Sequence, residues 1–141
     1  MKHQDKLISE YLQYISNYNL KSGLKDFMSF FKTIDEFEIE LFYKDKINMH
    51  DIRICNKSEK LQKNFGRTKQ PFSMVVYQDY FSFYIRGRNN MFRDDKLCKK
   101  FSNCHKNNSG ELIFKLTNPQ EIKSLLDYIF IDSLNIKRKI S

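Results

Sequence analysis

Hydrophobic and polar positions are patterned most clearly over residues 72–88, where two apolar runs meet across a short turn. With Gln78 and Asp79 in the turn, Val76 faces Phe81, because opposed residues share a face and successive side chains alternate. The same register pairs Tyr77 with Tyr80, Met74 with Phe83 and Phe72 with Ile85. One face of the predicted β-hairpin is then entirely apolar: Phe72, Met74, Val76, Phe81, Phe83 and Ile85. A register shift of one residue would mix apolar and polar side chains on both faces.

The other face of the predicted hairpin is amphipathic and carries Ser73, Val75, Tyr77, Tyr80, Ser82, Tyr84 and Arg86. Such side chains can lie at a surface with their polar ends in water. Two arrangements remain open for this face. It can be exposed and available to a ligand, or an N-terminal helix can cover it and leave the tyrosines in the core.

Periodicity predicts the remaining elements. Alternation over residues 36–43, 49–55 and 111–117 predicts three strands in addition to the hairpin strands 71–77 and 80–86. Helical spacing of apolar residues predicts helices over residues 5–19 and 24–34, separated at Ser22 and Gly23. A third helix is predicted from Pro119 to about Phe130, with Asn118 as its cap and Glu121 reaching back as in a capping box.

These elements predict an α+β fold: an antiparallel sheet of about five strands with the N-terminal and C-terminal helices packed on one face. By length, residues 1–141 are expected to form a single compact domain. Between the hairpin and the last strand, a short helix is predicted to begin at Asp94 and Asp95, followed by a polar, turn-rich connection over residues 102–110. Residues 137–139 are expected to form a frayed basic tail.

The net charge of +8 is unevenly distributed along the chain. Residues 1–56 carry 8 Lys or Arg against 9 Asp or Glu, residues 57–106 carry 12 against 4, and residues 107–141 carry 5 against 4. The whole excess therefore lies in the middle third, which contains the hairpin and its two flanking loops. A basic cluster of this kind indicates contact with nucleic acid or another polyanion.

Composition excludes some classes of protein. With 40% hydrophobic and 30% charged residues the chain is expected to fold. It contains no apolar run long enough to span a membrane, so we expect a cytoplasmic protein without a membrane partner. The three cysteines, Cys55, Cys98 and Cys104, cannot all pair within one chain, which also fits a reducing compartment.

Candidate catalytic and metal sites are incomplete. Cys98, Cys104 and His105 suggest zinc, but a fourth ligand is missing and the spacing is wide for a structural site. Glu38, Glu40 and Lys44 are the residue types of the acidic pair and lysine in metal-dependent nucleases, but their spacing along one strand face is wrong, and the required aspartate on a neighbouring strand would have to be Asp51. The four glycines form no phosphate-binding loop. We therefore predict no cofactor, no metal and no catalytic residue.

The leading prediction is a small, basic, non-enzymatic binding module for DNA, RNA or a nucleoprotein complex. Lys and Arg neutralise phosphates, while aromatic rings stack on unpaired bases. The predicted binding residues are Lys63, Arg67, Lys69, Tyr77, Tyr80, Tyr84, Arg86, Arg88 and Arg93. Within this set Arg86 and Arg88 are predicted to form a phosphate clamp. The alternative is an interaction or inhibitor factor whose basic face binds an acidic protein, and the third candidate is a small metal-dependent nuclease.

Overall fold

A computed structural model describes residues 2–66, 68–87, 89, 91–92 and 96–139. Its helices are α1 (Lys2–Tyr14), α2 (Tyr18–Lys32), α3 (Lys96–Lys100) and α4 (Pro119–Leu126), with short helical segments η1 (Asp45–Ile47), η2 (Gln62–Phe65) and η3 (Asp127–Ser133). Its strands are β1 (Phe37–Lys44), β2 (Met49–Asn56), β3 (Phe72–Val76), β4 (Phe81–Ile85), β5 (Cys104–Lys106) and β6 (Leu112–Leu116). In this part of the chain, no helix is both long and apolar enough to cross a membrane.

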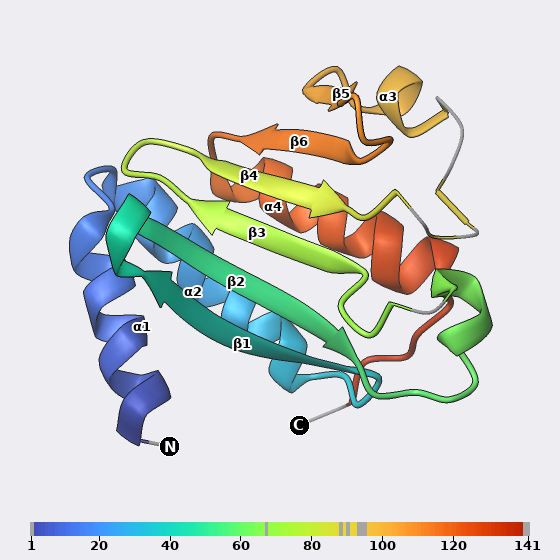
Figure 1. Cartoon of the computed structure of the whole chain (residues 1–141), viewed down its shortest axis with the longest axis horizontal. Coiled ribbons are helices and arrows are strands. Elements are labelled where there is room, and N and C mark those ends of the chain that lie inside the picture. The colour runs from blue at the N-terminus through green and yellow to red at the C-terminus, as the bar shows by residue number, and fades with distance from the viewer. Residues whose placement is uncertain (1, 67, 88, 90, 93–95, 140–141) are drawn as a thin grey trace.

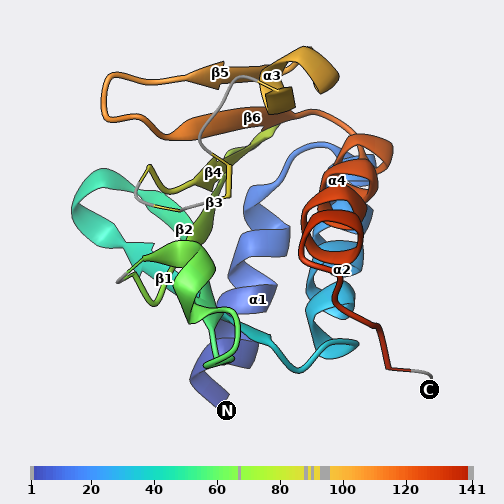
Figure 2. The same ribbon diagram turned by 90° about the vertical axis from the view of Figure 1, so that its right-hand side faces the viewer.

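The strands form one antiparallel sheet in the order β1-β2-β3-β4-β6-β5 (Figure 1). Figure 2 shows that α1, α2 and α4 all lie on the same side of this sheet. We call that side the inner face and the opposite side the outer face. The α+β class and the position of the terminal helices are therefore as predicted.

The central hairpin has the predicted register. Val76 pairs with Phe81, Met74 with Phe83 and Phe72 with Ile85. The backbone N–H of Tyr77 donates to the carbonyl of Tyr80 at 3.0 Å and closes the turn at Gln78 and Asp79. The predicted apolar face is fully buried against the helices.

The described part of the sheet has six strands and not five, because the prediction missed β5. This strand has three residues and lies inside the segment that we expected to be a turn-rich connection. It forms by pairing with β6, where Cys104 lies opposite Phe114. A disulfide between Cys98 and Cys104 ties it to α3. Two cysteines are therefore paired, which contradicts the zinc interpretation and removes the cysteine argument for a reducing compartment.

The first two helices differ from the prediction at their boundary. Helix α1 ends at Tyr14, and α2 begins at Tyr18 because the side chain of Asn17 accepts hydrogen bonds from the N–H groups of Asn19 and Leu20. Gly23 does not separate two helices but lies inside α2. A Cβ atom at Gly23 would come within 2.9 Å of Ile122, so this glycine allows α2 and α4 to pack closely.

The C-terminal helix begins as predicted. Asn118 accepts a hydrogen bond from the N–H of Glu121 at 2.9 Å, and the Glu121 carboxylate bonds back to Thr117. The expected frayed tail is wrong, because the segment after η3 is held against α2. The N–H of Lys139 donates to the carbonyl of Thr33, and the Arg138 guanidinium lies over the Phe30 ring.

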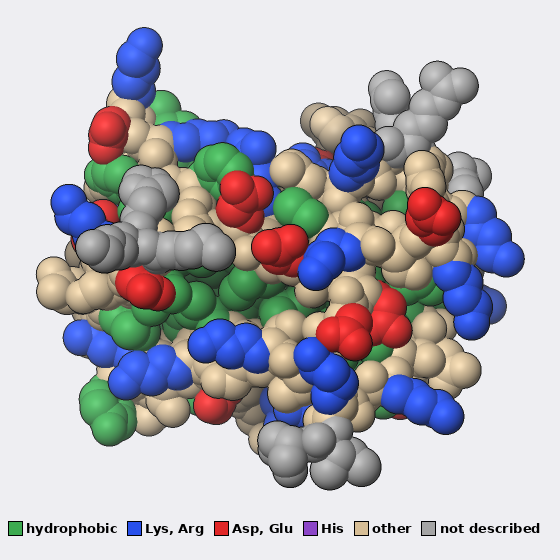
Figure 3. Space-filling view, turned by 90° about the horizontal axis from the view of Figure 1, so that it is seen from below, with side chains coloured by type: hydrophobic (Ala, Val, Ile, Leu, Met, Phe, Trp, Pro, Cys, Tyr) green, Lys and Arg blue, Asp and Glu red, His purple; other side chains and the backbone are tan. Residues whose placement is uncertain are grey.

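The inner face of the β1 edge is closed by α1. Leu41 N–H donates to the Gln4 side-chain oxygen at 2.9 Å, and the Gln4 amide donates to the Leu41 carbonyl at 3.3 Å. Beside this contact runs a groove of about 410 Å³ between α1, α2 and β1. Figure 3 views the molecule from this side and shows apolar side chains surrounded by charges of both signs.

His50 fills the junction between α1 and the sheet. Its ring stacks on that of Tyr14, with the ring centroids 3.8 Å apart. The ring centroids of Tyr11 and Tyr43 lie 5.0 Å and 4.7 Å from that of His50. The side chain is buried, and within the described chain its Nδ1 atom has no hydrogen-bond partner. Burial lowers the pKa of His50, against a smaller opposite effect of the Glu10 carboxylate.

This lowered pKa predicts a loss of stability in acid. The folded protein holds His50 neutral, whereas the unfolded chain takes up a proton near the ordinary histidine pKa of about 6.5. The stabilising contribution is therefore present above that pH and is lost as the pH falls through the lower pKa of the folded state. Urea unfolding at a series of pH values should show this loss in the wild type and in the exposed-site control His105→Gln, and not in His50→Gln. Identical pH profiles for all three proteins would contradict the prediction.

Candidate nucleic-acid interface

The outer face of the sheet presents the predicted tyrosines. In the described part of the chain no helix packs on this side (Figures 1 and 2). Tyr77, Tyr80 and Tyr84 are each half-buried, with their exposed parts on the outer face. Of the two arrangements that the sequence left open, the covered one is therefore wrong.

Tyr77 and Tyr80 form an aromatic stack at the turn of the hairpin. Their ring centroids are 4.7 Å apart with an interplanar angle of 21°. The ammonium group of Lys115, from the neighbouring strand β6, lies 4.8 Å from the centre of the Tyr80 ring. This end of the outer face thus combines flat aromatic surface with a positive charge, two features that bind bases and phosphates in single-stranded nucleic acids.

The middle of the outer face has a floor of small side chains. Three small residues of the hairpin are buried on this face: Ser73, Val75 and Ser82. The larger Tyr84 lies opposite Ser73 in the register. Burial raises the pKa of Tyr84, and the Glu111 carboxylate raises it further. Both effects favour the neutral phenol, which can donate a hydrogen bond.

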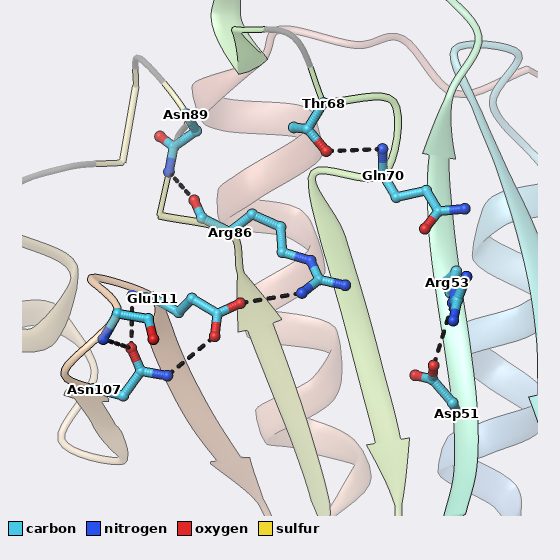
Figure 4. A network of polar contacts seen from close by, with 9 residues as sticks. Asp51, Arg53, Thr68, Gln70, Arg86, Asn89, Asn107 and Glu111 are labelled. Carbon is cyan, nitrogen blue, oxygen red and sulfur yellow. Dashed lines mark hydrogen bonds and ion pairs between the residues drawn. The ribbon is translucent and has the colours of Figure 1, made fainter. Parts of the chain in front are cut away.

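Two charged residues of β2 complete this middle region. Asp51 lies opposite Phe42 and Val75, and Arg53 donates from its Nε to the Asp51 carboxylate at 3.4 Å. The Arg53 guanidinium lies 4.3 Å from the centre of the Phe42 ring. These contacts hold the guanidinium and the carboxylate side by side at the surface of the sheet (Figure 4).

At the other end of the hairpin, Arg86 lies in a polar network (Figure 4). Its guanidinium pairs with Glu111 at 3.3 Å, and the second carboxylate oxygen of Glu111 accepts a hydrogen bond from Asn107 at 3.0 Å. A groove of about 320 Å³ lies beside it, lined by Thr68, Gln70, Arg86, Gly87, Ser109 and Glu111. Arg86 keeps 42% of its side chain exposed, so it can still bind a ligand, but it also has a structural role that the clamp hypothesis did not include.

The excess positive charge lies in the loops and not on the strands. Residues 57–70 carry five Lys or Arg against one Glu, and residues 87–106 carry six against two Asp. The first segment joins the end of β2 to the start of β3, and the second follows the end of β4, so both begin at the Arg86 end of the sheet. On the described outer-face strands, Lys44, Arg53, Arg86 and Lys115 are matched by Glu38, Glu40, Asp51 and Glu111.

The predicted site residues are therefore only partly brought together. Lys69 is exposed in the loop beside the Arg86 groove, and Lys63 is exposed in η2 of the same loop. Tyr77 and Tyr80 lie at the opposite end of the hairpin, and Tyr84 lies between. Arg67, Arg88 and Arg93, and with them half of the predicted clamp, lie outside the described residues.

The predicted site did not include Lys115, Arg53 or Asp51, although alternation along β2 places Arg53 and Asp51 on the outer face. The signal was present, since Leu112, Phe114 and Leu116 face inward and therefore place Lys115 outward. The nuclease interpretation gains no support, because Glu40 lies opposite Arg53 and Asp51 opposite Phe42. Among the described residues, no group of three His, Cys, Asp or Glu side chains could hold a metal ion. No protein-family model, curated protein or solved structure matches this chain.

Proposed function

We propose that this protein is a non-enzymatic nucleic-acid-binding module whose ligand lies on the outer face of the sheet. The observation that carries the proposal is the uncovered outer face with Tyr77, Tyr80 and Tyr84 along it. Unpaired bases stack on such rings, and stacking contributes about 1–3 kcal/mol for each base. The basic loops at the Arg86 end supply charges that neutralise phosphates.

The course of the ligand follows from this arrangement. It runs along the hairpin from the Tyr77 and Tyr80 stack, past Tyr84, to the groove beside Arg86. The outer-face strands are nearly neutral, so they favour contact with bases, whereas the loops favour contact with phosphates. Residues of both kinds are needed, because stacking alone is weak and phosphate contacts alone lose most of their affinity at high salt.

Two single-charge variants test the placement of the ligand. Lys115→Gln removes a positive charge from the outer face. Lys25→Gln removes a positive charge from an exposed position of α2, on the opposite side of the sheet. Lys115→Gln should weaken binding of a labelled single-stranded oligonucleotide and reduce the slope of log affinity against log salt by about 0.7. Lys25→Gln should leave this slope unchanged.

The measurement is fluorescence anisotropy at several salt concentrations, with circular dichroism as a check that both variants fold. If the wild type binds no oligonucleotide, single-stranded or duplex, the proposal is wrong and the acidic-protein alternative takes its place. If the two variants have the same effect, the ligand does not lie on the outer face.

A further inference from the structure

Asp51 is an unusual residue for the floor of a surface that binds a polyanion. Its side chain faces outward between Phe42 and Val75, yet the residue is only 7% exposed. A buried carboxylate opposes phosphate binding by charge repulsion, so it does not serve affinity for the backbone. Its position requires a separate explanation.

The carboxylate is held in one orientation and keeps one oxygen available. Oδ2 accepts from Arg53, whose guanidinium is in turn held over Phe42. The backbone carbonyl of Asp51 accepts a hydrogen bond of 2.7 Å from the buried Tyr11 hydroxyl, which fixes the strand at this point. Among the described residues, no hydrogen bond to Oδ1 is formed. Asp51 and Arg53 therefore present a fixed acceptor beside fixed donors.

We infer that Asp51 and Arg53 read the edge of an unpaired base and select bases that carry an exocyclic amino group. This inference rests on the proposed function. The amino group of cytosine donates to Asp51 Oδ1, and the adjacent ring acceptor takes a hydrogen bond from Arg53. Acceptance of the cytosine amino group by a carboxylate is a known form of base recognition.

Uracil fits this pair poorly. The base-pairing edge of uracil has a single donor, the ring N–H, which lies between two carbonyl oxygens. If that N–H donated to Asp51, one of the carbonyl oxygens would lie against the carboxylate and be repelled.

Duplex nucleic acid is excluded for a different reason. Its Watson–Crick edges are already paired, and Asp51, only 7% exposed on the sheet surface, lies too deep for a base edge in a groove to reach it. The ligand class is thus single-stranded nucleic acid with an amino-bearing base at the centre of the site.

The test compares homopolymers of deoxycytidine and deoxyuridine, which differ in the amino or carbonyl group at position 4 of the base and in whether the adjacent ring nitrogen is an acceptor or an N–H donor. With fluorescently labelled strands of about twelve nucleotides, the wild type should bind the cytosine strand about fivefold to a hundredfold more tightly. Asp51→Asn should remove most of this preference, because the amide can turn and donate to the uracil carbonyl. Its affinity for the uracil strand should rise, since a negative charge is removed.

Glu40→Gln is the matched control. Glu40 is an exposed carboxylate of the same face, opposite Arg53, so the variant removes the same charge without removing the Asp51 acceptor. It should raise the affinity for both strands and leave their ratio unchanged.

The outcomes separate this inference from the function on which it rests. Equal wild-type affinity for the two strands, or equal affinity for a duplex, overturns the inference and leaves the proposed function standing. Absence of binding to any oligonucleotide overturns both. Because the wild type alone decides the base preference, the result does not depend on whether Asp51→Asn folds.

Discussion

Replacing Phe72 with alanine should lower the free energy of unfolding by about 3–5 kcal/mol, a large part of the stability of a domain of this size. Phe72 is completely buried at the start of β3, where strands, loop and C-terminal segment meet. Its ring lies within 5.1–6.3 Å of five others, those of Phe37, Phe65, Phe83, Phe92 and Phe130. Removing it leaves a cavity that these rings, held by separate elements, cannot fill together.

Urea unfolding followed by circular dichroism measures this loss, and Phe42→Ala is the control. Phe42 is half-buried on the outer face, so its removal exposes less apolar surface and creates no internal cavity. Phe42→Ala should therefore lower the free energy of unfolding clearly less than Phe72→Ala does. Equal losses would mean that the ring cluster around Phe72 is not the centre of the core.

The second large effect is expected for Gly87→Ala. A Cβ atom at this position would lie 2.8 Å from the Ser109 carbonyl oxygen and 3.1 Å from backbone atoms of Gly110. These are backbone atoms of a turn that is closed by hydrogen bonds to the Asn107 side chain and carbonyl. The turn must therefore move, at a cost of about 1–3 kcal/mol.

Movement of this turn also displaces Glu111 from Arg86. We therefore expect Gly87→Ala to speed amide exchange at Gly110 and Glu111, in addition to lowering stability in urea. Ser109→Ala provides the comparison, since the exposed serine side chain is removed while its carbonyl stays, and its effect should remain within about 0.5 kcal/mol. Unchanged exchange in Gly87→Ala would show that the glycine is not needed for the close approach.

The hairpin and the terminal helices could be predicted because each depends on a local pattern. In the hairpin, only one register places the apolar residues of both strands, such as Val76 and Phe81, on the same face. At the C-terminal helix, Asn118 followed by Pro119 marks the start. Strand β5 could not be predicted in this way, because three residues without alternation become a strand only through pairing with β6. Gly23 was read as a break because its partner, Ile122 of α4, is almost a hundred residues away.

For the candidate site, alternation predicted which side chains share a face but not what that face contacts. The outward direction of Tyr84 and Arg86 follows from the strand pattern. Whether a helix covers them depends on the path of α1 and α2, which no local pattern encodes. The pairing of Arg86 with Glu111 was missed for the same reason, since β4 and β6 are separated in the chain by α3 and β5.

The contact between Gln4 and Leu41 has a consequence for the behaviour of this protein in concentrated solution. An uncovered edge strand is a template on which a strand of another molecule can add, and such pairing leads to aggregation. At the centre of the β1 edge, the Gln4 amide already takes the donor and the acceptor that an incoming strand would need. A second molecule must dislodge the first turns of α1 before it can pair along β1. The helix that packs on the inner face thus also protects the β1 edge from pairing with a second molecule.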